Sequence, residues 1–194
     1  MIKPYLFLML GFPGSGKSYF AERLAREMGA LHLNSDAMRL AIFGSRDETD
    51  RIYHSDYRPV LNTYTFGAMN CATKSALNNG ISVVYDANNN SVQERADIAA
   101  SLENNTILPV VVWVSVPKEV AIHRVINRRE TENQRQLSEE DAQIYIDKID
   151  NDIEAPDESE NIIRIDGTIP FEQQYMYHSK NKFMSLRSDI LAQI

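Results

Sequence analysis

The chain is poor in cysteine, with Cys71 as the single copy among 194 residues. One cysteine cannot form an intramolecular disulfide, so a small secreted scaffold held by disulfides is excluded. This composition fits a reducing compartment, and we expect a cytoplasmic protein. Cys71 falls in an apolar stretch, which predicts a small buried side chain rather than a nucleophile.

Histidine and long hydrophobic runs are also scarce. No histidine lies at a metal-ligand spacing from another histidine or from the cysteine, so the sequence does not indicate a zinc site. The four copies are His32, His54, His123 and His178. No apolar run approaches the roughly 18 residues of a membrane helix. The apolar N-terminus is too short for a signal peptide and lacks a small-residue cleavage site. We therefore expect no membrane partner.

A basic excess is missing as well. The formal net charge is −7 and the isoelectric point is about 5.1. The chain therefore lacks the net positive charge that is typical of nucleic-acid-binding proteins, although the composition allows a local basic surface. The acidic stretch 147–160 would repel a long polyanion if it lay near the site.

What the sequence does contain is a regular alternation of apolar runs and amphipathic segments. Such alternation predicts a parallel sheet with helices on both faces, in one domain over residues 1–194. Ser35 or Asp36 is expected to cap the helix 37–43, and the polar stretch from Gly44 to Asp56 is predicted to be a loop near the acceptor side of a site. The predicted strands are 5–10, 31–34, 81–85, 108–116 and 162–165, and the predicted helices are 17–28, 37–43, 60–77, 92–102, 118–129, 139–149 and a helical tail within 168–194.

The most specific motif runs from Gly11 to Ser18 and matches G-x-x-x-x-G-K-[ST] in full, between a buried strand and an amphipathic helix. Glycines let successive backbone N–H groups point inward as an anion nest, and the helix that follows adds its positive end. Lys17 would reach the outer phosphates of a nucleotide, and the Ser18 hydroxyl would bind the accompanying magnesium. The predicted cofactors are therefore ATP and Mg²⁺. The predicted nucleotide-binding residues in this segment are Gly11, Pro13, Gly14, Ser15, Gly16, Lys17, Ser18 and Tyr19.

A second group follows the next strand, in Asn34-Ser35-Asp36-Ala37-Met38-Arg39. In doubly wound sheets ligands bind at the carboxyl ends of the strands, which places Asp36 at the same edge as Lys17. A carboxylate there can accept the proton of an attacking hydroxyl, and Arg39, three residues on, can hold an anionic group. The alternative is a plain helix cap with a solvated arginine.

Two further segments carry charge suited to phosphate chemistry. Asp86 ends an apolar strand and resembles the carboxylate that holds magnesium beside a phosphate loop, or else it only caps a turn. Arg95, on the next helix, is a weaker candidate for the acceptor side. Arg124 and Arg128 are four apart and share a helix face, where they either close over phosphates or only complement the helix dipole.

Together, Gly11-Phe12-Pro13-Gly14-Ser15-Gly16-Lys17-Ser18 and the segment from Asn34 to Arg39 resemble the P-loop kinase superfamily, especially its small AAA-like kinases. That group includes polynucleotide 5′-kinase domains, chloramphenicol phosphotransferase and zeta toxins, and the resemblance covers about Leu6 to Gly167. It implies an α/β P-loop NTPase three-layer sandwich with a five-stranded, mostly parallel sheet and a small helical lid. The implied division is a core over 1–167, a lid over 129–137 and a tail over 168–194.

The resemblance also implies roles for individual residues. The aspartate at Asp36 acts as general base in such kinases, and the arginine at Arg39 contacts the acceptor. Arg124 corresponds to an arginine that stacks on adenine, and Arg128 to a lid arginine that contacts phosphates, with Arg129 or Arg135 as substitutes. The segment Asp166-Gly167-Thr168 corresponds to the border of the adenine site.

The leading hypothesis is therefore an ATP- and magnesium-dependent kinase. Its partner would be a small molecule or an oligonucleotide with a free hydroxyl, and the protein itself a monomer or homodimer. The alternatives are a nucleotide-hydrolysing switch without a small acceptor and a zeta-toxin-like kinase. No N-K-x-D motif follows a strand and no LSGGQ-like segment occurs, which counts against a GTPase and a transporter ATPase.

Overall fold

The computed structural model describes residues 4–100, 107–129, 136–157 and 159–174, and the backbone of 176–178 and 182–184. Within these ranges one sheet has the strand order β2-β3-β1-β4-β5-β6-β7. The first five strands in this order run parallel: β1 (Tyr5–Leu10), β2 (Leu31–Asn34), β3 (Val83–Asp86), β4 (Leu108–Ser115) and β5 (Ile162–Asp166). The predicted five-stranded parallel sheet is thereby confirmed.

An antiparallel extension follows β5. In place of the helix expected in the tail, the described residues form a short 3-10 turn, η1 (Phe171–Gln173), and the strands β6 (Met176–His178) and β7 (Lys182–Met184). Strand β6 pairs antiparallel with β5, and β7 pairs with β6. The edge of the sheet beyond β5 is therefore extended by the tail.

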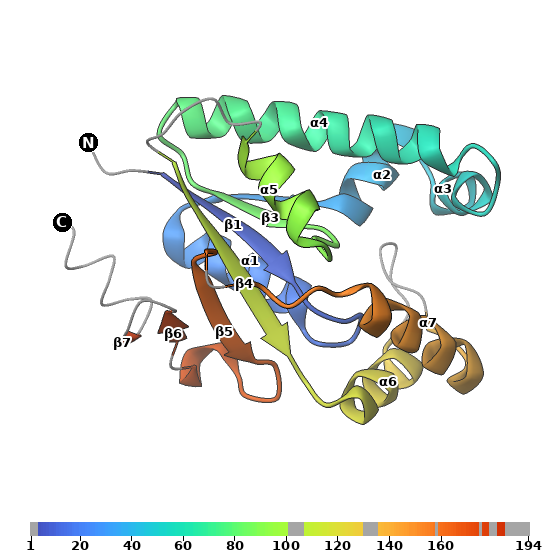
Figure 1. Cartoon of the computed structure of the whole chain (residues 1–194). Coiled ribbons are helices and arrows are strands. Elements are labelled where there is room, and N and C mark those ends of the chain that lie inside the picture. Colours follow the sequence, from blue (N-terminus) through green and yellow to red (C-terminus); the bar gives the residue numbers. More distant parts are fainter. Residues whose placement is uncertain are drawn as a thin grey trace.

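The apolar run of β1 is buried on both faces because helices cover both sides of the sheet (Figure 1). Phe7 and Met9 pack in one core cluster with helix α1 (Lys17–Met28). Leu6 and Leu8 pack in the other, with helix α4 (Arg58–Asn78). Helix α5 (Val92–Ala100) lies on the same side as α4 (Figure 1). The three layers of the predicted sandwich are present.

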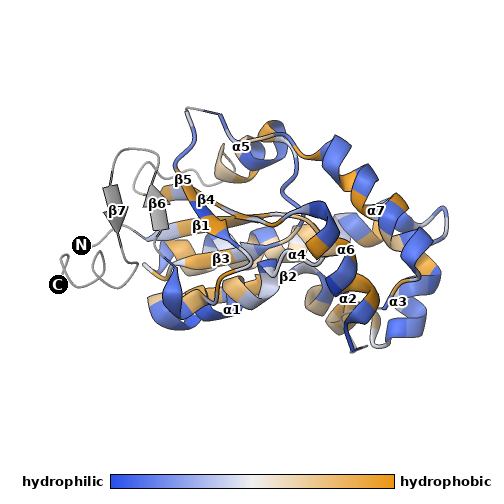
Figure 2. Cartoon of the chain, turned by 90° about the horizontal axis from the view of Figure 1, so that it is seen from below, coloured by the Kyte–Doolittle hydropathy of each residue, from blue (hydrophilic) through white to orange (hydrophobic). Residues whose placement is uncertain are grey.

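Four helices lie near the carboxyl ends of the parallel strands (Figure 1). They are α2 (Ser35–Phe43), α3 (Arg46–Tyr53), α6 (Lys118–Asn127) and α7 (Glu139–Asp152). Buried Val125 and Ile146 join α6 and α7 in a third apolar cluster. The ribbon of α3 is mostly hydrophilic and that of α7 is mixed, whereas β1 and β4 are largely hydrophobic (Figure 2). Most of the predicted lid, residues 130–135, lies outside the described residues.

Two local predictions were wrong. The polar segment predicted as a loop contains helix α3, whose Ser45 side chain caps it by accepting from the Glu48 backbone N–H at 3.2 Å. Cys71 is exposed on α4 rather than buried, since that helix turns its core face elsewhere, with Met69 and Thr73 buried. In the described part of the chain, no helix has the combined length and apolarity that a membrane span requires.

Candidate functional site

The phosphate loop connects the end of β1 to α1, at the edge where the parallel strands end. Gly14 and Gly16 have φ values of 83° and 93°, in the left-handed region that glycine adopts without strain. A Cβ on Gly14 would also collide with the Ala121 carbonyl oxygen. Helix α1 begins without a side-chain cap, so its first backbone N–H groups are available to an anion.

The other loop residues surround this turn. Gly11 is closely packed, since a Cβ there would meet the Val114 carbonyl oxygen. Ser15 is fully buried, and its hydroxyl oxygen has no hydrogen-bond partner. Pro13 and Ser18 are half-buried. Tyr19 is 40% exposed, with the Arg23 guanidinium 3.6 Å above its ring, so it lies outside the turn itself.

Lys17 bridges the phosphate loop to the segment after β3. Its Nζ donates to the Ala87 carbonyl oxygen at 2.9 Å and to Asn88 Oδ1 at 3.1 Å. The segment itself is held by buried Asn89, whose Nδ2 donates to the Met9 carbonyl oxygen at 2.8 Å. A charged ammonium that rests on neutral acceptors can transfer to phosphate oxygens when these enter the loop.

Asp86, at the end of β3, is a buried carboxylate beside this ammonium, with 2% of its surface exposed. Its Oδ2 accepts from Asn34 Nδ2 at 2.7 Å and lies 3.3 Å from His32 Nε2. Burial acts to raise the pKa of Asp86, but the His32 contact, the Lys17 charge and the Asn34 amide together lower it. Asp86 is therefore ionised at neutral pH, as a magnesium ligand must be.

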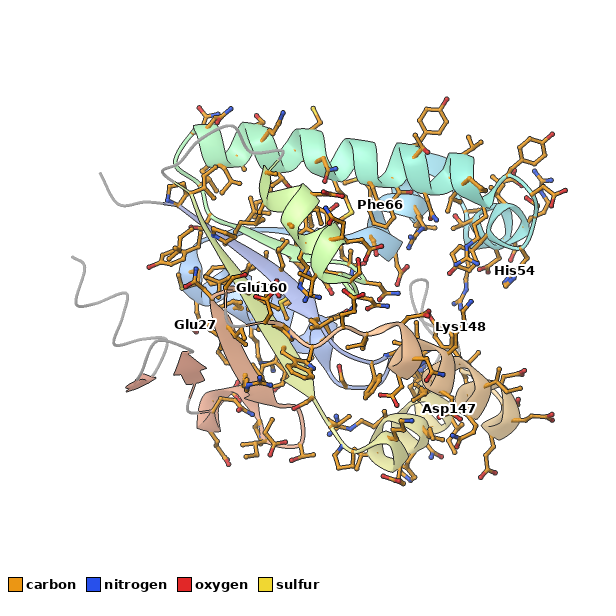
Figure 3. The ribbon with its side chains drawn as sticks, viewed as in Figure 1. Glu27, His54, Phe66, Asp147, Lys148 and Glu160 are labelled. Carbon is orange, nitrogen blue, oxygen red and sulfur yellow. The ribbon has the colours of Figure 1, made fainter. Side chains whose placement is uncertain are left out.

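Helix α2 carries the second predicted group. The Asp36 side chain is 57% exposed and pairs with Arg39, whose Nη1 lies 2.8 Å from Asp36 Oδ1. The Arg39 side chain is only 12% exposed, and its Nε is buried without a partner. The rings of Tyr53 and Phe66 lie 5.9 and 5.6 Å from its guanidinium carbon, with Phe66 on the side of α4 that faces α2 (Figure 3).

The cap of α2 differs from the prediction. Neither Ser35 nor Asp36 caps this helix, because Asn34 does: its Oδ1 accepts from the backbone N–H groups of Asp36 and Ala37 at 3.1 and 2.9 Å. Asn34 is the last residue of β2, and asparagine is among the preferred capping residues. The sequence signal was therefore present one residue before the predicted cap.

Tyr145 on α7 is a residue near Asp36 and Arg39 that the sequence did not single out. Burial, followed by the Tyr53 and Asp36 side chains, raises the pKa of the Tyr145 phenol, whereas the Arg128 and Arg39 charges act to lower it. These groups therefore share one neighbourhood, which brings Arg128 at the end of α6 towards the helix that bears Asp36. No spacing along the chain links Tyr145 to the residues around it.

Arg124 approaches the phosphate loop from α6. Its Nη1 donates to the Gly167 carbonyl oxygen at 2.9 Å, and lies 3.3 and 3.4 Å from the carbonyl oxygens of Gly14 and Ser15. One guanidinium thus joins the phosphate loop to the turn after β5, the segment that was expected to border adenine.

Arg95 does not face an acceptor, and this prediction was wrong. Its side chain is 1% exposed and pairs with Glu160 through two contacts, Nε to Oε1 at 2.7 Å and Nη2 to Oε2 at 2.9 Å. The same guanidinium donates to the carbonyl oxygens of Asn89, Asn90 and Glu154. Arg95 therefore stabilises the segment after β3 through the carbonyl oxygens of Asn89 and Asn90.

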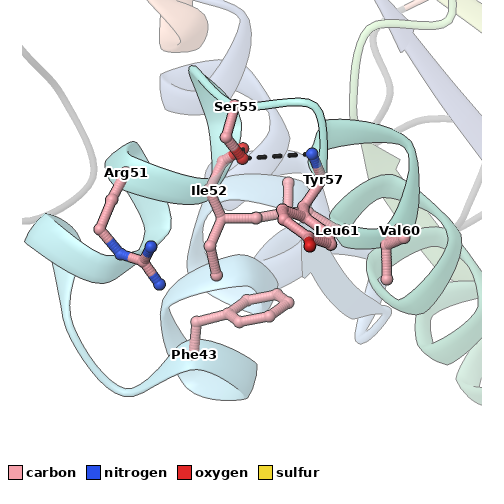
Figure 4. A pocket seen from close by; sticks show the side chains of 7 residues that line it. All are labelled: Phe43, Arg51, Ile52, Ser55, Tyr57, Val60 and Leu61. Atoms are coloured by element: carbon pink, nitrogen blue, oxygen red, sulfur yellow. Dashed lines mark hydrogen bonds between the residues drawn. The ribbon is translucent and has the colours of Figure 1, made fainter.

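A cavity of about 300 Å³ lies farther out, between α2, α3 and the start of α4 (Figure 4). Neither Lys17 nor Asp36 lines it. It is lined by Phe43, Arg51, Ile52, Ser55, Tyr57, Val60 and Leu61. Its wall is mostly apolar, so it does not contribute to the phosphate site.

The donor set fits a magnesium–nucleotide complex. Magnesium prefers oxygen ligands, and the Ser18 hydroxyl at the start of α1 and the buried Asp86 carboxylate could supply them. Within the described residues, no cluster of three or more histidine, cysteine or acidic side chains could hold a metal ion by itself. An ion here would therefore depend on phosphate oxygens as well.

The family model of the AAA domain matches residues 6–149. No curated protein sequence gives a significant match. The matched range includes the phosphate loop, Asp36 and Asp86, so the AAA-like part of the resemblance is confirmed.

Three solved structures with a similar fold are between 16% and 20% identical to this chain in sequence. At this level of identity the likeness concerns the fold alone. A candidate kinase from Chloroflexus aurantiacus is 16% identical with a TM-score of 0.68, covering 99% of both chains. A sugar kinase from Janibacter sp. is 17% identical with a TM-score of 0.62, covering 88% of this chain and 89% of its own. Kti12 from Chaetomium thermophilum, in complex with ADP-AlF3, is 20% identical with a TM-score of 0.59, covering 83% and 88%.

Proposed function

The chain belongs to the AAA domain family, and from this premise we propose that it is an ATP- and magnesium-dependent kinase that phosphorylates a hydroxyl group. The acceptor is a small molecule or a nucleic-acid 5′ end. Similar folds occur in a sugar kinase and in a protein bound to ADP-AlF3, which agrees with a phosphoryl transfer site.

One chain of contacts supports this proposal most directly. The Lys17 charge acts on Asp86, Asp86 accepts from Asn34, and Asn34 caps the helix that carries Asp36. Lys17, which would bind phosphates, and Asp36, which could accept a hydroxyl proton, are thereby held at the same edge of the sheet. A switch that only hydrolyses nucleotide has no need of the paired Asp36 and Arg39.

In the proposed reaction, the loop amides and Lys17 bind the phosphates of ATP. Magnesium, bound with the nucleotide, would neutralise phosphate charge between Ser18 and Asp86. The acceptor hydroxyl lies against Asp36, which takes its proton as the oxygen attacks the γ-phosphorus. The bond from that phosphorus to the β–γ bridging oxygen breaks, and ADP leaves. Arg39 and Arg128 stabilise negative charge on the acceptor and on the transferring group.

The test is transfer of labelled phosphate from ATP to sets of 5′-hydroxyl oligonucleotides, nucleosides, sugars and hydroxyl-bearing antibiotics. Asp36→Asn should keep nucleotide affinity and lose about two orders of magnitude in transfer, because an amide cannot accept the proton. Glu27→Gln, at an exposed position of α1 (Figure 3), is the matched control and should transfer normally.

Unchanged transfer by Asp36→Asn would contradict the assignment of Asp36 as base. Hydrolysis of ATP at a rate that no acceptor raises would instead support the switch.

A further inference from the structure

We propose that Asn34 is a positioning residue that holds the metal-side carboxylate and the base-carrying helix in fixed relation. The inference rests on the proposed function, because it assigns Asn34 a part in the same reaction. Asn34 was not among the residues that the sequence singled out.

The orientation of the Asn34 amide follows from its partners. The backbone N–H groups of Asp36 and Ala37 can only donate, so the amide oxygen must face them, at 3.1 and 2.9 Å. The ionised carboxylate of Asp86 can only accept, so the amide nitrogen must face it, at 2.7 Å. One side chain therefore satisfies both neighbours, and a flipped amide would lose all three contacts.

The sheet places the Asn34 amide between Asp86, at the end of β3, and helix α2, which carries Asp36. Asn34 and Asp86 are direct partners in the parallel pairing of β2 and β3, each at the last position of its strand. Helix α2 starts at the next residue, so Asp36 lies in its first turn. Any rotation of α2 about its start must move the Asn34 oxygen, and with it the nitrogen that holds Asp86.

The contacts on Asp86 also determine which of its oxygens is free. Asn34 and His32 both contact Oδ2, at 2.7 and 3.3 Å. No described residue forms a hydrogen bond with Oδ1. Two neighbours on one oxygen restrict the rotation of the carboxylate, and Oδ1 is left for a metal ion. Ligating carboxylates are commonly oriented in this way, and loss of such a support weakens metal affinity by about 10–100-fold.

The experiment separates the two uses of the amide. Asn34→Ser keeps an oxygen that caps α2 but has no donor that reaches Asp86, whereas Asn34→Ala removes both. Binding of Mn²⁺ in the presence of ADP, followed by electron paramagnetic resonance, needs no acceptor and no turnover. We expect Asn34→Ser to weaken Mn²⁺ binding about tenfold or more and to lower kcat, with the acceptor KM and the metal-free affinity for ADP unchanged.

His32 supplies a second route to the same measurement, independent of the helix cap. His32→Phe should weaken Mn²⁺ binding, and His32→Gln, which keeps a donor, should restore much of it. His123→Phe is the matched control, since His123 is exposed on α6. Thermal unfolding of each variant shows whether it is folded, and the His32 pair decides the question if Asn34→Ser does not fold.

Mn²⁺ affinity unchanged in both Asn34→Ser and His32→Phe would overturn the inference, as would wild-type protein that fails to bind Mn²⁺ with ADP. The proposed function fails separately if the wild-type protein hydrolyses ATP at a rate that no acceptor raises and transfers phosphate to none. Weakened Mn²⁺ binding in Asn34→Ser would then still support Asn34 as the support of Asp86, although not as a link to a base.

Discussion

At the scale of single residues, the Lys17 ammonium has hydrogen-bond partners that it can exchange for phosphate oxygens. The ammonium rests on the Ala87 carbonyl oxygen and the Asn88 amide oxygen, both neutral, rather than on an acidic side chain. The nearby Asp86 is already satisfied on Oδ2 by Asn34. Lys17 can therefore exchange weak partners for phosphate oxygens without breaking an ion pair, which would be more costly.

Lys17→Ala should accordingly weaken ATP binding by about 1.5–3 kcal/mol, the usual contribution of a hydrogen bond to a charged group, and reduce turnover with it. Equilibrium binding of a fluorescent ATP analogue measures the loss. Lys74→Ala, at an exposed position of α4, serves as the control and should bind normally. Equal affinity in the two variants would count against the phosphate loop as the nucleotide site.

At the scale of elements, α5 depends on a residue of another segment. The Arg95 side chain of α5 is only 1% exposed, and Glu160, which neutralises its charge, lies just before β5. The helix itself begins with a capping box, since Glu94 N–H donates to Ser91 Oγ at 3.0 Å and Ser91 N–H to Glu94 Oε2 at 3.2 Å. Local caps thus define where α5 starts, and the ion pair determines where it lies.

Glu160→Gln should therefore destabilise the protein strongly, by about 3–5 kcal/mol, because it leaves the buried Arg95 charge uncompensated. Urea unfolding followed by circular dichroism measures this loss. Glu48→Gln breaks an exposed pair with Arg51 and should leave the urea midpoint nearly unchanged, because solvent screens that pair. Similar midpoints for the two variants would contradict a structural role for the Arg95–Glu160 pair.

Element prediction from the sequence succeeded where local signals decide the structure. The apolar run before Gly11 and the glycine after α1 define their elements without help from the rest of the fold. Helix α3 was missed because its composition is polar, although Ser45 and Glu48 stand at capping spacing. Cys71 was misplaced because an apolar stretch does not tell which side of a long helix meets the sheet.

For the whole molecule, alternation of strands and helices predicted the parallel sheet but could not give the position of each strand. The site divides in the same way. The phosphate loop and Asp86 were predictable because each stands at the end of a buried apolar strand that the sequence shows directly. The surroundings of Tyr145 and the Arg95–Glu160 pair were not, because they depend on how separate segments pack together, 65 residues apart in the case of the ion pair.

The phosphate loop is tied to both sides of the sheet, and this leads to a prediction for the molecule as a whole. Lys17 joins it to the segment after β3, and Arg124 joins it to the turn after β5. A nucleotide bound to the native loop should stabilise the entire fold by mass action, by about 2.7 kcal/mol at one hundred times Kd. For a protein of this size that corresponds to a rise in Tm of about 5–10 °C. Differential scanning fluorimetry with MgADP measures it, and the midpoint should rise with the logarithm of concentration. The Lys17→Ala variant should need higher concentrations for the same rise, whereas a midpoint that ignores MgADP in the wild-type protein would mean that this loop does not bind nucleotide.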